Sequence, residues 1–131
     1  MQSKMSQRTC IVVDDEPAIR TYLSTVLERE DFRTLEAENA PQAFRMLQTL
    51  NGAVDLVLTD VQMPGDMDGE DLAFAIRQAF PLIPVILSSG YGPPRRRAAE
   101  FEFIEKPFRP DAILTVVKRL TDRPNVQAAS S

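Results

Sequence analysis

Two hydrophobic patterns alternate along the chain. Short apolar runs, each followed by polar residues, glycine or proline, are typical of buried strands in a parallel sheet. Between them lie segments with apolar residues every three or four positions, which is the spacing of an amphipathic helix. The expected strands cover residues 9–13, 34–37, 56–59, 85–87 and 101–104. Strands that alternate with helices in this way predict βαβ units and a parallel sheet covered on both faces.

The expected helices have recognisable first turns. Pro17 and Pro110 suit the start of a helix, and Asn39 and Asp68 are expected N-caps. The second and third of these helices are expected to end near Leu50 and Ala79, and the expected inner faces are Ala18, Ile19, Tyr22, Leu23, Val26 and Leu27; Ala43, Phe44, Leu47 and Leu50; Leu72, Ala73, Ile76 and Phe80; and Ile113, Leu114, Val117 and Leu120. Each stripe gives its helix one side that must pack against the sheet.

Polar groups follow four of the expected strands directly. They are Asp14–Glu16, Asp60, Ser88–Gly90 and Glu105–Pro107. Ligands of open parallel sheets bind beyond the carboxyl ends of the strands, so these groups are expected at one functional edge. The first and third strands must be neighbours for their aspartates to meet there. The resulting prediction is a flavodoxin-like, doubly wound sheet of five parallel strands in the order 2-1-3-4-5.

Three carboxylates at one edge repel each other unless a cation lies between them. The chain has no histidine and one cysteine, so an all-oxygen site for a hard ion is expected, and Mg²⁺ fits a site with few carboxylates and phosphate oxygens. A carboxylate beside Mg²⁺ can attack a phosphoryl group and form an acyl phosphate. Lys106 and Ser89 would supply donors to the phosphoryl oxygens.

Composition narrows the function further. The net charge of −4 argues against a general nucleic-acid binder, and Arg95–Arg97 is read as a solvated run. Cys10 lies within an apolar run and is expected to be a buried structural thiol. No stretch is apolar enough to span a membrane, and the first residues lack a secretory signal, so a cytoplasmic setting is expected. The expected organisation is a disordered segment over residues 1–8, one domain over 9–121 and a tail over 122–131.

Four motifs in order resemble the receiver domain of two-component response regulators. They are Asp14-Asp15, Asp60 followed by Met63-Pro64 and Gly69, Ser89-Gly90, and Lys106-Pro107-Phe108. The resemblance spans residues 9 to 120 and implies that Asp60 accepts a phosphoryl group. It also implies that Asp15, Asp60 and the backbone carbonyl of Gln62 bind Mg²⁺, with Asp14 acting mostly through water.

The resemblance implies roles for further residues. Ser89 would hydrogen-bond the phosphoryl oxygens, and Lys106 would pair with them. Phe103 matches an aromatic switch residue that turns inward when Ser89 moves. Gln62 and Tyr91 match positions that set the lifetime of the phosphoryl group.

The expected partners also follow from the resemblance. The donor would be a sensor histidine kinase or a histidine phosphotransfer protein, and the output would be a downstream protein. Only residues 122–131 follow the last helix, so a stand-alone regulator without an output domain is expected, either a monomer or a phosphorylation-dependent dimer.

Two departures from the receiver pattern stand out. The loop after Pro64 is one residue longer than the common pattern. The stretch between Ser89 and Lys106 is short and contains Pro93-Pro94, so the helix expected over residues 92–99 is stunted or absent. In receivers this helix, the last strand and the last helix form the face through which dimers assemble. The short stretch therefore argues against a dimer through that face here.

Two other functions fit parts of the pattern. A Mg²⁺-dependent phosphohydrolase with an aspartyl-phosphate intermediate would have a second aspartate two residues after Asp60, where this chain has Gln62. A docking module that is never phosphorylated would tend to lose some of the acidic residues, Ser89 or Lys106, and all are retained. The chain is therefore expected to catalyse at most its own phosphorylation and dephosphorylation.

Overall fold

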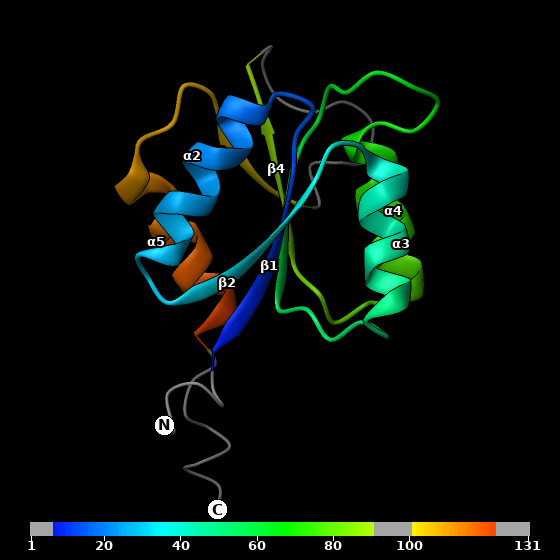
Figure 1. Cartoon of the computed structure of the whole chain (residues 1–131), viewed down its shortest axis with the longest axis horizontal. Helices are drawn as coiled ribbons and strands as arrows, with labels where there is room; N and C mark the ends of the chain where they lie inside the picture. Colours follow the sequence, from blue (N-terminus) through cyan, green and yellow to red (C-terminus); the bar gives the residue numbers. More distant parts are fainter. Residues whose placement is uncertain (1–6, 91–100, 123–131) are drawn as a thin grey trace, which may run out of the picture.

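The computed structural model describes residues 7–90 and 101–122 and shows a sheet between two pairs of helices (Figure 1). Along the chain the elements are β1 (Arg8–Val13), α2 (Pro17–Glu28), β2 (Phe32–Ala37), α3 (Ala40–Thr49), β3 (Leu56–Asp60), α4 (Gly69–Ala79), β4 (Val85–Ser89), β5 (Glu102–Glu105) and α5 (Pro110–Thr121). The helix expected over residues 92–99 lies outside the described residues, as do residues 1–6 and 123–131.

The strands form one parallel sheet in the order β2-β1-β3-β4-β5, which confirms the predicted topology. In register, Val13 lies opposite Thr59, and Asp60 lies opposite Ser88. The carboxyl ends of β1, β3 and β4 therefore reach the same edge. This alignment brings the polar groups that follow each strand together.

The two faces of the sheet carry separate cores. Helices α2 and α5 cover one face, and α3 and α4 cover the other (Figure 1). Strands β3 and β4 are buried along their whole length, because both of their faces lie under helices. Continuous apolar runs such as Leu56–Leu58 are what a strand covered on both faces requires.

Strand boundaries differ slightly from the prediction. β1 begins at Arg8, which pairs with Phe32, so Arg8 belongs to the sheet and not to a disordered segment. β2 begins at Phe32, two residues earlier than expected. Its sequence mixes the apolar Phe32, Leu35 and Ala37 with polar residues, so no continuous apolar run marks where the strand starts. β5 runs over Glu102–Glu105, one residue later than expected.

Both predicted N-caps are confirmed. The Asn39 side chain accepts a hydrogen bond from the Gln42 amide at 2.8 Å. At the start of α4, Asp68 and Asp71 form a reciprocal capping box, with each side chain accepting from the other's backbone amide at 2.9 Å. The capping box fixes the point at which the chain leaves the loop after β3.

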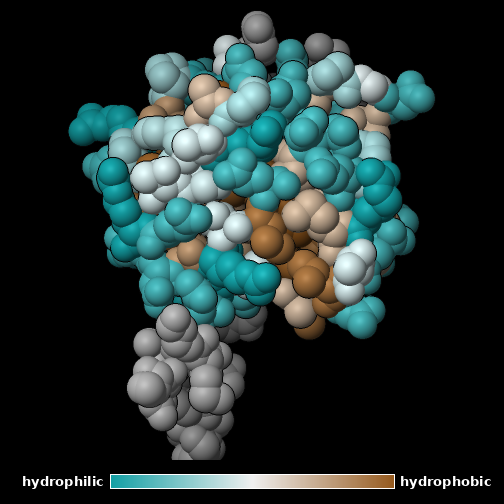
Figure 2. Space-filling view, viewed as in Figure 1, coloured by the Kyte–Doolittle hydropathy of each residue, from teal (hydrophilic) through white to brown (hydrophobic). Residues whose placement is uncertain are grey.

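The helical inner faces largely match the expected stripes. In α2, Leu23, Val26 and Leu27 are buried as expected, but Ala18 is exposed and Tyr22 is 36% exposed. Figure 2 shows polar residues over most of the viewed surface, with apolar side chains gathered between β2 and α3. No helix within the described ranges is long and apolar enough to cross a membrane.

Candidate functional site

Asp14 follows β1 and is 1% exposed. Its backbone amide donates to the Ala37 carbonyl at 3.1 Å, which extends the β1–β2 ladder by one residue. Its Oδ1 accepts from the Glu16 amide at 2.9 Å, so the carboxylate also closes the turn before α2. Asp14 is therefore held by backbone on two sides.

Lys106 connects the two buried carboxylates. Its Nζ lies 3.2 Å from Asp60 Oδ1 and 3.4 Å from Asp14 Oδ2. The Lys106 amide donates to the Ser89 carbonyl at 2.8 Å, which ties the end of β5 to the end of β4. The peptide that joins Lys106 to Pro107 is cis. The lysine predicted from the sequence as a phosphoryl partner thus lies directly at the acidic cluster.

The three predicted aspartates come together. One carboxylate oxygen from each of Asp14, Asp15 and Asp60 lies within 4.8 Å of the other two, and Asp15 is exposed to solvent. This group consists of hard oxygen donors, and the chain has no histidine. Such a donor set fits Mg²⁺, which prefers a few carboxylates and keeps several waters.

The acidic surroundings change the ionisation of the site. Burial raises the pKa of Asp60 to about 6, and the Asp14 carboxylate adds to this effect, whereas Lys106 opposes it. The pKa of Lys106 is raised: its burial acts in the opposite direction, but the Asp60 and Asp14 carboxylates outweigh that burial. Lys106 therefore stays protonated near neutral pH, and Asp60 carries its negative charge there despite its raised pKa.

An open pocket of about 460 Å³ gives access to this cluster, and its lining includes Asp15, Asp60, Gln62 and Lys106. Gln62 is exposed at the pocket. Ser89 is 3% exposed at the end of β4, and Phe103 is half-buried against the core on the α3–α4 side. Tyr91 lies outside the described residues.

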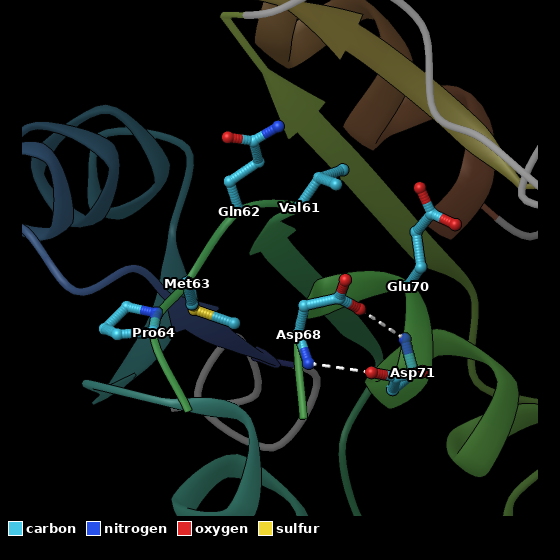
Figure 3. A pocket seen from close by; sticks show the side chains of 7 residues that line it. All are labelled: Val61, Gln62, Met63, Pro64, Asp68, Glu70 and Asp71. Carbon is cyan, nitrogen blue, oxygen red and sulfur yellow. Dashed lines mark hydrogen bonds between the residues drawn. The ribbon is translucent and has the colours of Figure 1, made fainter. Parts of the chain in front are cut away.

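The loop after β3 also lines a larger pocket of about 750 Å³, drawn in Figure 3. Its lining includes Gln62 and the buried Glu70, and Figure 3 shows the polar ends of these two side chains pointing the same way. The Asp68–Asp71 hydrogen bonds appear there as dashed lines. Gln62 thus lies between the two pockets.

Gly69 is required where the loop returns to β3. A Cβ on Gly69 would lie 1.9 Å from the backbone oxygen of Asp60, and the Gly69 amide donates to the Val61 carbonyl at 2.9 Å. We expect Gly69→Ala to lower the free energy of unfolding by about 2 kcal/mol, because backbone must move to admit the methyl group. Urea unfolding would measure this.

Gly90→Ala is the matched control for that substitution. A Cβ on Gly90 would meet Lys106 Cβ at 3.7 Å, an ordinary contact, so we expect a change within about 0.5 kcal/mol. Equal stability of the two variants would contradict the tight approach of Gly69 to Asp60.

The comparisons with known proteins agree with this geometry. The family model for the response regulator receiver domain matches residues 10–118. The chain belongs to this family. A CheY-like receiver from Methanospirillum hungatei superposes with a TM-score of 0.79 at 26% identity, covering 89% of this chain and 95% of that one. The NtrX receiver of Brucella abortus gives a TM-score of 0.74 at 31% identity, covering 86% and 98%.

Sequence relatives place receivers of this kind in longer proteins. A putative NtrX-like response regulator of Rickettsia felis is 33% identical over 88% of this chain, and the match spans 25% of that protein. The transcriptional regulatory protein ResD of Bacillus subtilis is 37% identical over 86% of this chain, and the match spans 48% of that protein. The chain thus spans a quarter to a half of the length of these two relatives.

The structure adds residues that the sequence analysis did not select. Arg20 in α2 donates from Nη1 to the Asp14 backbone carbonyl at 2.7 Å and from Nε to Glu36 at 3.3 Å. Ser24, one helical turn later, donates to the other oxygen of Glu36 at 3.0 Å. The signal available in the sequence was the i, i+4 spacing of two polar residues beside the apolar stripe of this helix.

An apolar pocket lies beside the acidic cluster of the receiver. It has a volume of about 540 Å³ and is lined by Ile19, Tyr22, Gly90, Lys106, Pro107 and Phe108. The Tyr22 and Phe108 rings stack with centroids 6.2 Å apart. An apolar surface therefore borders the site on the side of α2 and α5.

Proposed function

We propose that this receiver accepts a phosphoryl group on Asp60 from a histidine of a sensor kinase or of a histidine phosphotransfer protein. The observation that carries the proposal is Lys106 Nζ between Asp60 and Asp14, at 3.2 and 3.4 Å, beside a third carboxylate. A carboxylate that can attack phosphorus, beside an ammonium that can neutralise the phosphoryl oxygens, is suited to receive and hold a phosphoryl group.

The chemistry follows from the placement of these groups. An Asp60 carboxylate oxygen attacks phosphorus, the P–N bond of the phosphohistidine breaks, and the imidazole leaves with the bonding electrons and takes a proton from solvent. Lys106 neutralises negative charge on the phosphoryl oxygens, and Ser89 lies at the neighbouring strand end to donate to them.

Asp15 and Asp60, with the Gln62 carbonyl, are the groups proposed to hold Mg²⁺, and Asp14 acts through water. When bound, the cation neutralises charge on the transferring phosphoryl group. Asp14, already bonded to the Glu16 amide and Lys106, keeps the cluster negative enough to attract a cation.

The proposed response involves β4 and β5. Phosphorylation adds charge beside the buried Asp60 and biases a two-state element. Ser89 moving toward the phosphoryl group would vacate space that Phe103, in register with Leu87 two residues earlier on β4, can enter. A downstream protein would read the changed surface. Gln62 and Tyr91 are proposed to set how long this state lasts.

The apolar pocket beside Lys106 supports the proposed donor. A donor must bring its histidine to Asp60 and bury apolar area against the receiver to stay there. The stacked rings of Tyr22 and Phe108 provide such a surface next to the acidic cluster. Aromatic rings of this kind supply much of the energy in protein interfaces.

Intact-mass spectrometry tests the proposal. The protein is incubated with Mg²⁺ and acetyl phosphate, beside Asp60→Asn and a sample treated with EDTA. One phosphoryl adduct on the wild type alone would support it. Mg²⁺ binding with no adduct, also after incubation with a phosphorylated histidine kinase, would favour a docking module. Steady phosphate release with no trapped adduct would favour a phosphohydrolase.

A further inference from the structure

Asp15 is held differently from the other two carboxylates of the site. Asp14 and Asp60 are buried and ion-paired with Lys106, but Asp15 is exposed. Within residues 7–90 and 101–122, no hydrogen bond or ion pair to the Asp15 carboxylate is found. The direction of this side chain must therefore be set by its own backbone, and above all by the peptide that joins it to Asp14.

Arg20 is hydrogen-bonded to that peptide. Its Nη1 donates to the Asp14 backbone carbonyl at 2.7 Å, a short charge-assisted hydrogen bond. The Arg20 side chain is only 13% exposed, so the bond is largely shielded from water. Because the carbonyl of Asp14 belongs to the same plane as the amide of Asp15, fixing one fixes the other.

Arg20 is itself anchored to the edge of the sheet. Its Nε donates to Glu36 Oε1 at 3.3 Å, and the buried Ser24 donates to Glu36 Oε2 at 3.0 Å. Glu36 lies in β2, next to Ala37, whose carbonyl accepts from the Asp14 amide at 3.1 Å. The Asp14 backbone is thus tied to β2 twice: directly through Ala37, and through the pair of Glu36 and Arg20.

We propose that Arg20, anchored by Glu36 and Ser24, is a positioning residue that orients the Asp14–Asp15 peptide and so sets the affinity of the site for Mg²⁺. This proposal rests on the proposed function, in which Asp15 is a direct ligand of the cation. Arginine suits the task because its planar fork makes two directed hydrogen bonds at once. A lysine would keep the positive charge but carries all its donors on one atom, so it lacks the separate Nε and Nη1 donors that reach Glu36 and the Asp14 carbonyl.

Arg20→Lys separates geometry from charge. Isothermal titration of the full chain with Mg²⁺ is expected to show roughly tenfold weaker binding, because partners that orient metal ligands typically have effects of this size. Arg33→Lys, an exposed arginine of β2, is the matched control and should bind as the wild type does. Wild-type affinity in Arg20→Lys would overturn the proposal.

A double-mutant cycle tests the anchor. If Glu36 acts through Arg20, Arg20→Lys combined with Glu36→Ala should bind Mg²⁺ no more weakly than Arg20→Lys alone. If the double variant instead lost Mg²⁺ affinity by the sum of the losses in Arg20→Lys and Glu36→Ala, Glu36 would act independently of Arg20. That result would overturn the assigned chain of contacts. Circular dichroism on each variant confirms that it is folded.

A measurement without metal distinguishes this proposal from the proposed function. In metal-free protein, amide hydrogen exchange followed by NMR should become faster in Arg20→Lys at Asp14 and Glu16, whose amides donate to the Ala37 carbonyl and to Asp14 Oδ1. Exchange should stay unchanged at Val57 in β3. Unchanged exchange at both Asp14 and Glu16 would overturn the positioning role even if Mg²⁺ binds. Faster exchange at these two amides in a chain that binds no Mg²⁺ would support the contact of Arg20 with the backbone and reject both the proposed metal site and the role of Arg20 in it.

Discussion

Asp60→Asn should stabilise the metal-free receiver at pH 7.5 by roughly 3 kcal/mol, although it removes the proposed phosphoryl acceptor. The pKa of Asp60 is raised to about 6 in the folded protein from an ordinary value of 3.8. Between these values the folded chain keeps a proton that the unfolded chain has lost, so stability falls as pH rises. Above pH 6 the full cost of a buried, crowded carboxylate is present.

Urea unfolding in EDTA at several pH values checks this expectation. The advantage of Asp60→Asn should shrink toward zero as the pH falls to 4, where Asp60 is protonated in the folded protein. Asp66→Asn, which changes an exposed loop carboxylate, is the control and should show no such trend. Added Mg²⁺ should stabilise the wild type and not Asp60→Asn. Equal stability of wild type and Asp60→Asn at pH 7.5 would contradict the expected cost.

Lys106→Met should slow phosphorylation of Asp60 by acetyl phosphate about 10²- to 10³-fold. The substitution keeps an apolar stem of similar length but removes the ammonium that lies 3.2 Å from Asp60 Oδ1. The phosphoryl oxygens then lack their cationic partner in the transition state. Mg²⁺ binding should be retained, because Lys106 competes with the cation for the same carboxylates. Adduct formation followed by mass spectrometry over time gives the rate.

Lys118→Met is the control for that experiment. Lys118 lies near the end of α5, is half-exposed and pairs with Glu30 at 3.1 Å. Its neighbour Arg119 pairs with Glu102 at the start of β5, at the opposite end of the sheet from the acidic cluster. Lys118→Met should become phosphorylated by acetyl phosphate at the wild-type rate. A similar rate in Lys106→Met would mean that the ammonium contributes to holding the cluster in the resting protein and not to the transfer.

Much of the fold was predictable from one pattern, the short apolar runs that are each followed by polar residues. Apolar runs without alternation, such as Val85–Leu87, occur where both faces of a strand are covered by helices, as in a parallel sheet. Because parallel strands end at the same edge of the sheet, the polar residues that follow each run meet there. The acidic cluster and Lys106 followed from that edge. Phe32 was missed because polar residues follow it directly, Arg33 and Thr34, so no continuous apolar run begins there.

The contacts that distinguish the Asp14 and Asp15 carboxylates could not be predicted from the sequence. Asp14 and Asp15 are adjacent and chemically identical, yet one is buried against Lys106 and the other faces solvent. Which of them turns inward depends on backbone hydrogen bonds to Ala37 and Glu16, and these exist only after β2 and α2 have packed. The hydrogen bond from Arg20 to the Asp14 carbonyl depends on the same packing.

The separation of the two cores has a consequence for how this chain can diverge in evolution. The acidic residues stand on the ends of strands, and the helices on each face pack against the sheet through their own cluster of apolar residues. Solvent-facing positions of α3 and α5 can therefore drift under selection for different partners without disturbing Asp60 or Lys106. One unchanged acidic cluster can in this way be combined with many different outer surfaces.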